Sequence, residues 1–386
     1  MNIQEAKYRV NWVDGMKINK SHFIDSENSL ISLVERSVKK TLSPINFGIL
    51  PVFSDDQKAI DVSISLDGQD SVEVIVNSCI AITLGGSLIY ITNHTRDLLE
   101  QSGYILKHQY TLNKEEEEWY VVLTANPYNP VPVGNADPNE EPPRHPFTLP
   151  EYKLSVLPSS EVTLKELGLY HITIGKIILV NDVPTLYESF IPPCSSIQSH
   201  EDLQFTYTEL GYFFNQMEAY CMHIIQKIHQ KKQTNDLAHM VKHVCERTMQ
   251  YLNNCITDFR LIDKHEPPIV MLTKQINLAR TIKSGLDVFT GTGKEALLNY
   301  LTDWCDLNQG AFENVLIDMI DLNYVHTDIN ISLEKTASFT KLMLSLFKKL
   351  NELDYIGKKN DSSIFVKEEV VESNKSVKSR RSFLLD

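Results

Sequence analysis

The sequence lacks any segment of the kind that crosses or enters a membrane. Its N-terminus, MNIQEAKYRVNW, has no apolar stretch that could serve as the core of a signal peptide. The longest uncharged run, residues 74–95, is interrupted by Asn77, Gly85, Gly86 and Asn93, and an alternating strand pattern fits it better than a membrane span. We therefore expect a cytoplasmic protein without transmembrane insertion.

The chain is also poor in cysteine and has no excess of positive charge. Its 6 cysteines are scattered over 386 residues, so we expect free thiols in a reducing compartment. Lysine and arginine together number 37 against 50 aspartates and glutamates, which gives a net charge of −13. An acidic chain argues against a general nucleic-acid-binding protein.

A complete phosphate-binding loop is missing. The segment 291–295, Gly-Thr-Gly-Lys-Glu, is similar to one around Lys294. However, Val288 stands where the loop needs its first glycine, and Glu295 replaces the hydroxyl residue that would reach magnesium. We interpret the segment as a turn between two helices.

A complete metal-binding motif is missing as well. His239 and His243 are four residues apart and would share one helix face near Cys245. Met240 occupies the position that holds a glutamate in metalloprotease helices, and no second cluster offers further ligands. We therefore predict no cofactor, no metal site and no catalytic activity, and keep a nucleotide- or metal-dependent enzyme as the rival class.

Two hydrophobic periods divide the chain. Residues 47–190 favour strands, because their apolar residues mostly alternate with polar ones between glycine turns. Farther on the spacing becomes helical, and Asn235 or Asp236 is placed to cap the second helix. The pattern predicts an α+β protein, with a β-sandwich and a leading helix in residues 1–195 and a helical bundle in residues 196–356.

A proline-rich stretch interrupts the strand region. Residues 126–152 contain 8 prolines. Proline cannot continue a helix or donate a hydrogen bond within a central strand. We therefore expect this stretch to be an exposed, extended excursion between two strands.

The longest regular pattern lies in residues 202–230. Apolar residues recur there at alternating intervals of four and three, a period of 3.5 that is typical of helices in left-handed bundles. We predict that part of this seam lies between copies of the chain and builds a trimer. The residues are Leu203, Tyr207, Leu210, Phe214, Met217, Cys221, Ile224 and Ile228.

The C-terminal tail, residues 357–386, differs from the rest in charge. Residues 375–386 carry four basic residues against Asp386, so their charge is +4 − 1 = +3. One interpretation is a solvated, disordered end. The other is a docking segment for an acidic partner or a lipid surface, with basic and apolar anchors. These anchors are Lys375, Lys378, Arg380, Arg381, Phe383 and Leu384.

Large apolar residues gather around a glycine turn near the N-terminus. Trp12, Met16 and Phe23 flank Gly15, and Ser21 is placed to cap the helix that follows. Large apolar groups are usually buried, so we predict that these three side chains pack inside the protein.

The segment 12–23, WVDGMKINKSHF, resembles the opening of the TssK family, the baseplate proteins of type VI secretion systems, which reads roughly W-x-E-G-M-x-L-x-P-x-H-F-Q. The identical positions are Trp12, Gly15, Met16, His22 and Phe23. Asp14 and Ile18 are conservative changes, whereas Lys20 replaces the proline and Ile24 the glutamine. Residues 190–193, Phe-Ile-Pro-Pro, are similar to a family motif at the join between the β and helical regions.

The resemblance implies a structural role in a contractile injection system. The β-sandwich would be a shoulder, like that of phage receptor-binding proteins, that docks on wedge proteins of the TssF and TssG type. The helical bundle would be a neck that forms a homotrimer. In the family a C-terminal head then binds the inner-membrane complex at the cytoplasmic face.

After the last predicted helix only about thirty residues remain, which are too few for such a head. We therefore expect a divergent form without the head, in which either the tail makes the membrane-side contact or the membrane-side partner differs. A phage-tail-like receptor-binding or adaptor protein is the alternative within the same structural class.

Overall fold

The computed structural model describes residues 7–53, 58–66, 71–113, 115–162, 167–305 and 307–357. The chain is an α+β protein with antiparallel sheets, and it divides into two compact units. Unit 1 comprises residues 1–201 together with 325–330, and unit 2 comprises 202–324 and 331–386. The sequence pattern did not indicate that residues 325–330 join unit 1.

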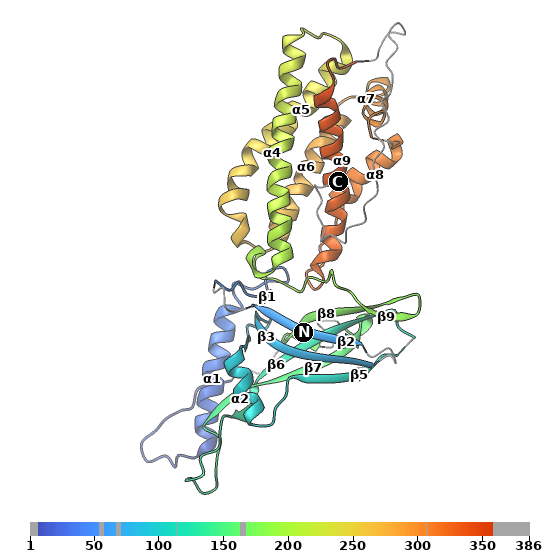
Figure 1. Cartoon of the computed structure of the whole chain (residues 1–386). Coiled ribbons are helices and arrows are strands. Elements are labelled where there is room, and N and C mark those ends of the chain that lie inside the picture. Colours follow the sequence, from blue (N-terminus) through green and yellow to red (C-terminus); the bar gives the residue numbers. More distant parts are fainter. Residues whose placement is uncertain are drawn as a thin grey trace. The chain divides into compact units, whose positions relative to one another are not determined.

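One sheet of unit 1 is organised around β3, which pairs antiparallel with every other strand of that sheet (Figure 1). The elements are β1 (Gly48–Ile49), β2 (Ile60–Leu66), β3 (Ser71–Ile82), β4 (Leu88–Ile91) and β5 (Lys107–Thr111), with helix α2 (Asn93–Gln101) after β4. Alternation along β3 buries Val72, Val74 and Val76 completely, as expected for a strand with one face on a core.

The second sheet has the order β7-β6-β8-β9. Its strands are β6 (Glu118–Val133), β7 (Phe147–Pro158), β8 (His171–Val180) and β9 (Val183–Leu186). The two sheets approach closely at Gly175 in β8, where an added Cβ would lie 2.4 Å from the Cδ1 atom of Ile64 in β2. A larger residue at position 175 would require the side chain of Ile64 to move.

Strands β6 and β7 run into the proline-rich stretch. Val131 pairs with Leu149, and Pro130 pairs with Pro150. Both ends of the stretch are extended, as expected, but they belong to strands β6 and β7 and do not form an excursion between strands. Pairing of β6 with β8 stops at Thr124, so beyond it β6 has a partner on one side only, and a missing proline N–H is tolerated there.

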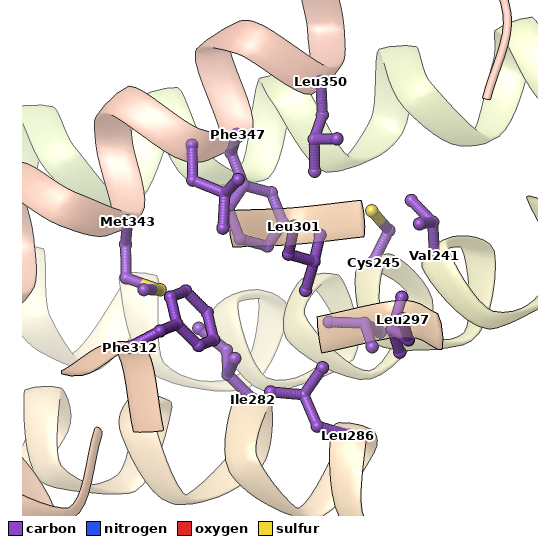
Figure 2. Close-up of a pocket in the computed structure, with 12 residues that line it drawn as sticks. Val241, Cys245, Ile282, Leu286, Leu297, Leu301, Phe312, Met343, Phe347 and Leu350 are labelled. Carbon is purple, nitrogen blue, oxygen red and sulfur yellow. The ribbon is translucent and has the colours of Figure 1, made fainter. Parts of the chain in front are cut away.

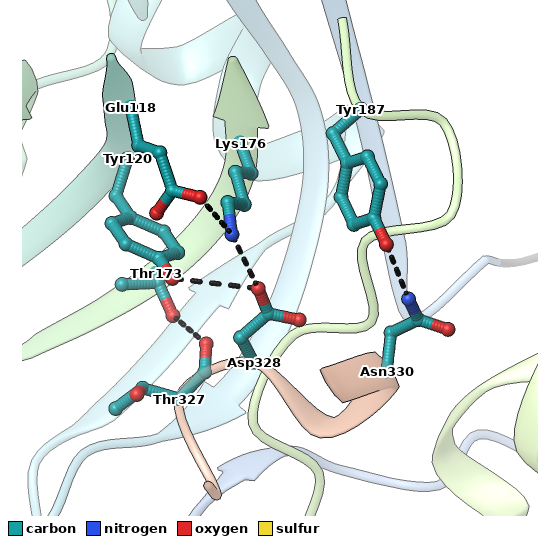
Figure 3. Close-up of polar contacts among 8 residues, drawn as sticks. All are labelled: Glu118, Tyr120, Thr173, Lys176, Tyr187, Thr327, Asp328 and Asn330. Atoms are coloured by element: carbon teal, nitrogen blue, oxygen red, sulfur yellow. Dashed lines mark hydrogen bonds and ion pairs between the residues drawn. The ribbon is translucent and has the colours of Figure 1, made fainter. Parts of the chain in front are cut away.

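Residues 325–330 bind to unit 1 through polar contacts that Figure 3 draws. Asp328 is completely buried, and its Oδ2 atom lies 3.1 Å from Nζ of Lys176 in β8. The same Nζ lies 3.3 Å from Oε1 of Glu118, and the hydroxyl of Tyr120 donates to Asp328 Oδ2 at 3.4 Å. Burial lowers the pKa of Lys176, but nearby negative groups, Asp328 among them, outweigh this and raise it.

The neighbours of Asp328 extend this attachment. The Thr173 hydroxyl donates to the carbonyl of Thr327 at 2.8 Å, and the side-chain amide of Asn330 donates to the hydroxyl of Tyr187 at 2.7 Å (Figure 3). The backbone N–H of Ile329 donates to a carbonyl of the same unit at 3.1 Å. Six consecutive residues thus form part of unit 1 although they lie far from its other residues in the sequence.

Unit 2 is a bundle of helices (Figure 1). Its elements are α4 (Glu201–Gln230), α5 (Asp236–Leu261), α6 (Ile269–Asp287), α7 (Thr292–Thr302), α8 (Gln309–Ile320) and α9 (Ile329–Glu352). Asn235 caps α5 by accepting from the backbone N–H of Ala238, as the sequence predicts. Figure 2 shows side chains of α5 to α9 meeting around a cavity of about 10 Å³, which is at most the size of one water molecule.

We predict that Asp328→Ala destabilises the protein by about 3–5 kcal/mol, because it leaves the buried ammonium of Lys176 without its closest buried partner. Chemical denaturation of the full chain measures this. The matched control is Asp354→Ala, which removes a solvent-exposed ion pair with Lys231 and should change stability little. Equal effects of the two substitutions would contradict the role assigned to the buried pair.

Candidate protein-binding surface

Helix α1 (Lys20–Val38) packs on unit 1 with its polar side inward. Its buried residues are Ser29, Ser32 and Glu35. An amphipathic surface helix ordinarily does the opposite and buries its apolar stripe. Five of the seven large apolar side chains of α1 are instead exposed, namely Phe23 (57%), Ile24 (42%), Leu30 (54%), Leu33 (41%) and Val34 (59%), whereas Ile31 and Val38 are half-buried.

Glu35 fixes this orientation. Its Oε2 atom accepts hydrogen bonds from the hydroxyl of Tyr128 in β6 at 2.7 Å and from the hydroxyl of Tyr170 at 3.1 Å. Burial raises the pKa of Glu35, and the two tyrosine hydrogen bonds offset this only in part.

A close backbone contact adds to the same anchor. Gly86 has a φ of +91°, and a Cβ atom there would lie 2.8 Å from the carbonyl oxygen of Glu35. The turn after β3 therefore requires glycine at this position, both for its conformation and for the close approach of α1. Small side chains at Ser29 and Ser32 permit that approach along the same face of the helix.

The start of α1 explains one residue of the N-terminal motif. Asn19 accepts a hydrogen bond from the backbone N–H of His22, and the His22 ring accepts one from the backbone N–H of Asn19. This reciprocal pair is a capping box that begins the helix. The cap is thus Asn19, two residues before the predicted Ser21.

Trp12 and Phe23 lie on the outside of the molecule. Trp12 is 49% exposed, and its ring centroid lies 6.3 Å from that of Phe23 and 6.1 Å from that of His22. Gly15, with a φ of +76°, turns the chain so that this contact forms, and Met16 is only half-buried. The prediction that Trp12, Met16 and Phe23 pack inside the protein is wrong for Trp12 and Phe23, which lie on the outer face of α1, and Met16 is buried only in part.

Five of these side chains define what we call the α1 surface: Trp12, Phe23, Leu30, Leu33 and Val34. Positions 23, 30 and 34 lie on one line of the helix, and position 33 lies beside them. Monomeric proteins rarely expose contiguous apolar area beyond a few hundred Å², and larger patches mark interaction sites. The α1 surface is therefore a candidate binding site for another protein.

The predicted trimer seam lies inside unit 2. Tyr207 is half-buried and stacks on Phe259 of α5, with ring centroids 4.4 Å apart. A side chain buried within its own chain offers no surface to another copy, so the prediction that this seam joins copies is wrong. The other seven seam residues, each at most 3% exposed, are Leu203, Leu210, Phe214, Met217, Cys221, Ile224 and Ile228.

The other candidate residues from the sequence analysis are the phosphate-loop lysine, the possible metal ligands and the tail anchors. Lys294 forms ion pairs with Asp287 at 2.8 Å and with Glu313 at 2.7 Å. Among the described residues, no group of three or more histidines, cysteines or acidic residues is arranged to hold a metal ion. The tail anchors in residues 375–386 lie outside the described residues.

Within the described ranges, no helix combines the length and the apolar character that a membrane crossing requires. Cys79 is a buried thiol, and burial raises its pKa to about 12. A thiol in this state is not a reactive nucleophile.

Comparisons with known proteins find a likeness in structure. No protein-family model and no curated protein matches the chain. The baseplate complex from the type VI secretion system is similar at 12% identity and a TM-score of 0.47, over 92% of this chain and 71% of that chain. A crystal structure of TssK is similar at 14% identity and a TM-score of 0.46, over 91% and 70%.

The TssK-TssF-TssG baseplate subcomplex of the type VI secretion system is similar at 14% identity and a TM-score of 0.43, over 90% of this chain and 99% of that chain. All of these are TssK structures. Likeness at this level assigns no role to a residue, and the roles proposed below come from this chain's own residues and contacts.

We predict that Glu35→Gln makes stability less dependent on pH. Because the folded-state pKa of Glu35 is raised above its ordinary value of 4.5, its contribution is fully present below that value and is lost as the pH rises through the raised pKa. Glutamine keeps an oxygen for the two tyrosine hydroxyls but has no such titration. Denaturation between pH of about 4 and about 7 measures the difference, and parallel profiles of the variant and the natural protein would contradict the assignment.

Proposed function

We propose that the protein is a structural baseplate subunit of a type VI secretion system, of the TssK kind. It would act as a trimeric adaptor between wedge proteins of the TssF and TssG type and the complex at the inner membrane. The observation that carries this proposal is the α1 surface, an apolar helix face held outward by a buried polar anchor.

Residues that carry the family resemblance contribute to this surface and to the turn and helix cap beside it. Trp12 and Phe23 contribute side chains to it, Gly15 makes the turn that brings them together, and His22 completes the helix cap. Met16, which follows Gly15 in the sequence, is half-buried. A motif that serves to present an apolar surface supports a role in assembly and does not suggest catalysis.

The charge around α1 indicates the character of its partner. Residues 7–40 carry 7 lysines and arginines and 4 acidic residues, so their charge is +7 − 4 = +3 within a chain of −13. A partner surface that is apolar at its centre and acidic at its rim would complement this region. We propose that this partner is the TssF–TssG wedge. Unit 1 would then be the shoulder that binds the wedge, and it would be built as a β-sandwich.

Two further parts of the proposal concern the rest of the chain. Unit 2 would be the neck on which the trimer forms. The basic tail, residues 375–386, would contact the membrane-side partner, so that the protein sits in the cytoplasm at the inner face of the membrane. Three tails on one trimer would raise the effective concentration of each for a multivalent partner.

We predict that the double substitution Leu30→Glu and Val34→Glu weakens binding of the TssF–TssG wedge from the same organism at least about tenfold, because charges would enter the centre of an apolar contact. Both side chains are more than half exposed, so stability should change little. Pull-down and calorimetry with the full chain measure binding.

The matched control is Val180→Glu with Val183→Glu, which places charges on two exposed apolar residues at the turn between β8 and β9, on the other side of unit 1 from α1 (Figure 1). The control should bind the wedge normally. Normal binding by the α1 variant would contradict the proposal. If that variant bound the wedge but lost its oligomeric state, the α1 surface would be a contact between copies.

A further inference from the structure

Helix α4 carries a second regular stripe, opposite the buried seam. Its members are again separated alternately by three and four residues, and all are exposed except the half-buried Ala219. Phe205, Tyr212 and Met222 are 42%, 52% and 41% exposed. We call this set the outer stripe of α4: Phe205, Thr208, Tyr212, Asn215, Ala219, Met222 and Gln226.

The outer stripe contains no charged residue. Over the whole chain 23% of residues are charged, and such residues concentrate on exposed positions. An outward helix face that stays uncharged for three heptads, with two aromatic rings and a methionine, has the composition of the core of an interface. Its constant period of 3.5 keeps it facing one partner helix when the two helices supercoil around each other with a left hand.

We propose that the outer stripe of α4 joins copies of this chain, with the α4 helices parallel around the symmetry axis. This inference rests on the trimer of the proposed function and identifies its surface. Around such an axis each residue near the centre meets the same residue of another copy, so any charge there repels itself. Uncharged aromatic, methyl, amide and thioether groups do not repel their own copies in this way, and the outer stripe consists of such groups.

The amide and hydroxyl residues of the stripe fit the same arrangement. Asn215 and Gln226 each carry a donor and an acceptor, so each can hydrogen bond to its own copy. A polar residue within an apolar seam fixes the register of the helices. Glu218 and His223 lie on either side of the outer stripe. Between parallel neighbouring helices, Glu218 of one copy would face His223 of the next, and these two residue types do not carry like charges.

The first test is the oligomeric state of the full chain by light scattering at micromolar concentration. We expect the natural protein to be a trimer and Tyr212→Glu with Met222→Glu to be a monomer with unchanged thermal unfolding. The matched control is Leu261→Glu with Ile262→Glu, two exposed apolar residues at the end of α5, and it should remain a trimer.

The outcomes separate this inference from the proposed function. A trimer that survives Tyr212→Glu with Met222→Glu would overturn the inference alone. A monomeric natural protein would overturn both the inference and the trimer of the proposed function. The same variant should still bind TssF–TssG through α1, so lost wedge binding by a well-folded monomer would show that wedge binding requires the trimer.

A second test does not depend on breaking the assembly. In a Cys305→Ser background, Met222→Cys should form a disulfide between copies under mild oxidation, because parallel helices bring position 222 against itself. The control Asn254→Cys, exposed on α5, should stay reduced. Absence of the cross-link at position 222, or equal cross-linking at position 254, would overturn the parallel arrangement.

Discussion

Three side chains determine which face of α1 the protein presents. The carboxylate of Glu35 receives hydrogen bonds from Tyr128 and Tyr170, and these bonds exist only when the polar face of the helix is inward. Hydrophobic burial alone would favour turning the helix over, because exposed apolar side chains such as Phe23, Leu30 and Val34 would then leave water. A buried carboxylate that finds its donors in one orientation only selects against that alternative.

A similar device attaches residues 325–330 to unit 1. Asp328 is completely buried and pairs with Lys176, while its neighbours bond to Thr173 and Tyr187. In both places an apolar core supplies the stability and a buried polar contact specifies which segment lies where. The chain can thus expose an apolar helix face and still have one defined structure.

The sequence predicts the kinds of element better than their partners. The seam of α4 is real as a pattern, and residues such as Phe214 and Met217 are buried as its period requires. Periodicity indicates that one face of a helix is buried, but not whether the same chain or another copy buries it. Here the buried face of α4 packs against residues of its own chain. The proline-rich strands were missed because proline excludes a strand only where hydrogen bonds are needed on both sides, which depends on tertiary context.

The N-terminal motif shows the same limit at the candidate site. The large apolar side chains of Trp12 and Phe23 predict burial from the sequence. In the structure they are exposed, because Glu35 holds the polar face of α1 inward. Nothing in the sequence distinguishes Glu35 from an ordinary surface glutamate. The most direct test of the outward α1 surface is hydroxyl-radical footprinting of Phe23, Leu30 and Leu33 with and without the TssF–TssG wedge. The account predicts rapid labelling of all three in the free protein and strong protection in the complex. Slow labelling in the free protein, or labelling that the wedge leaves unchanged, would contradict it.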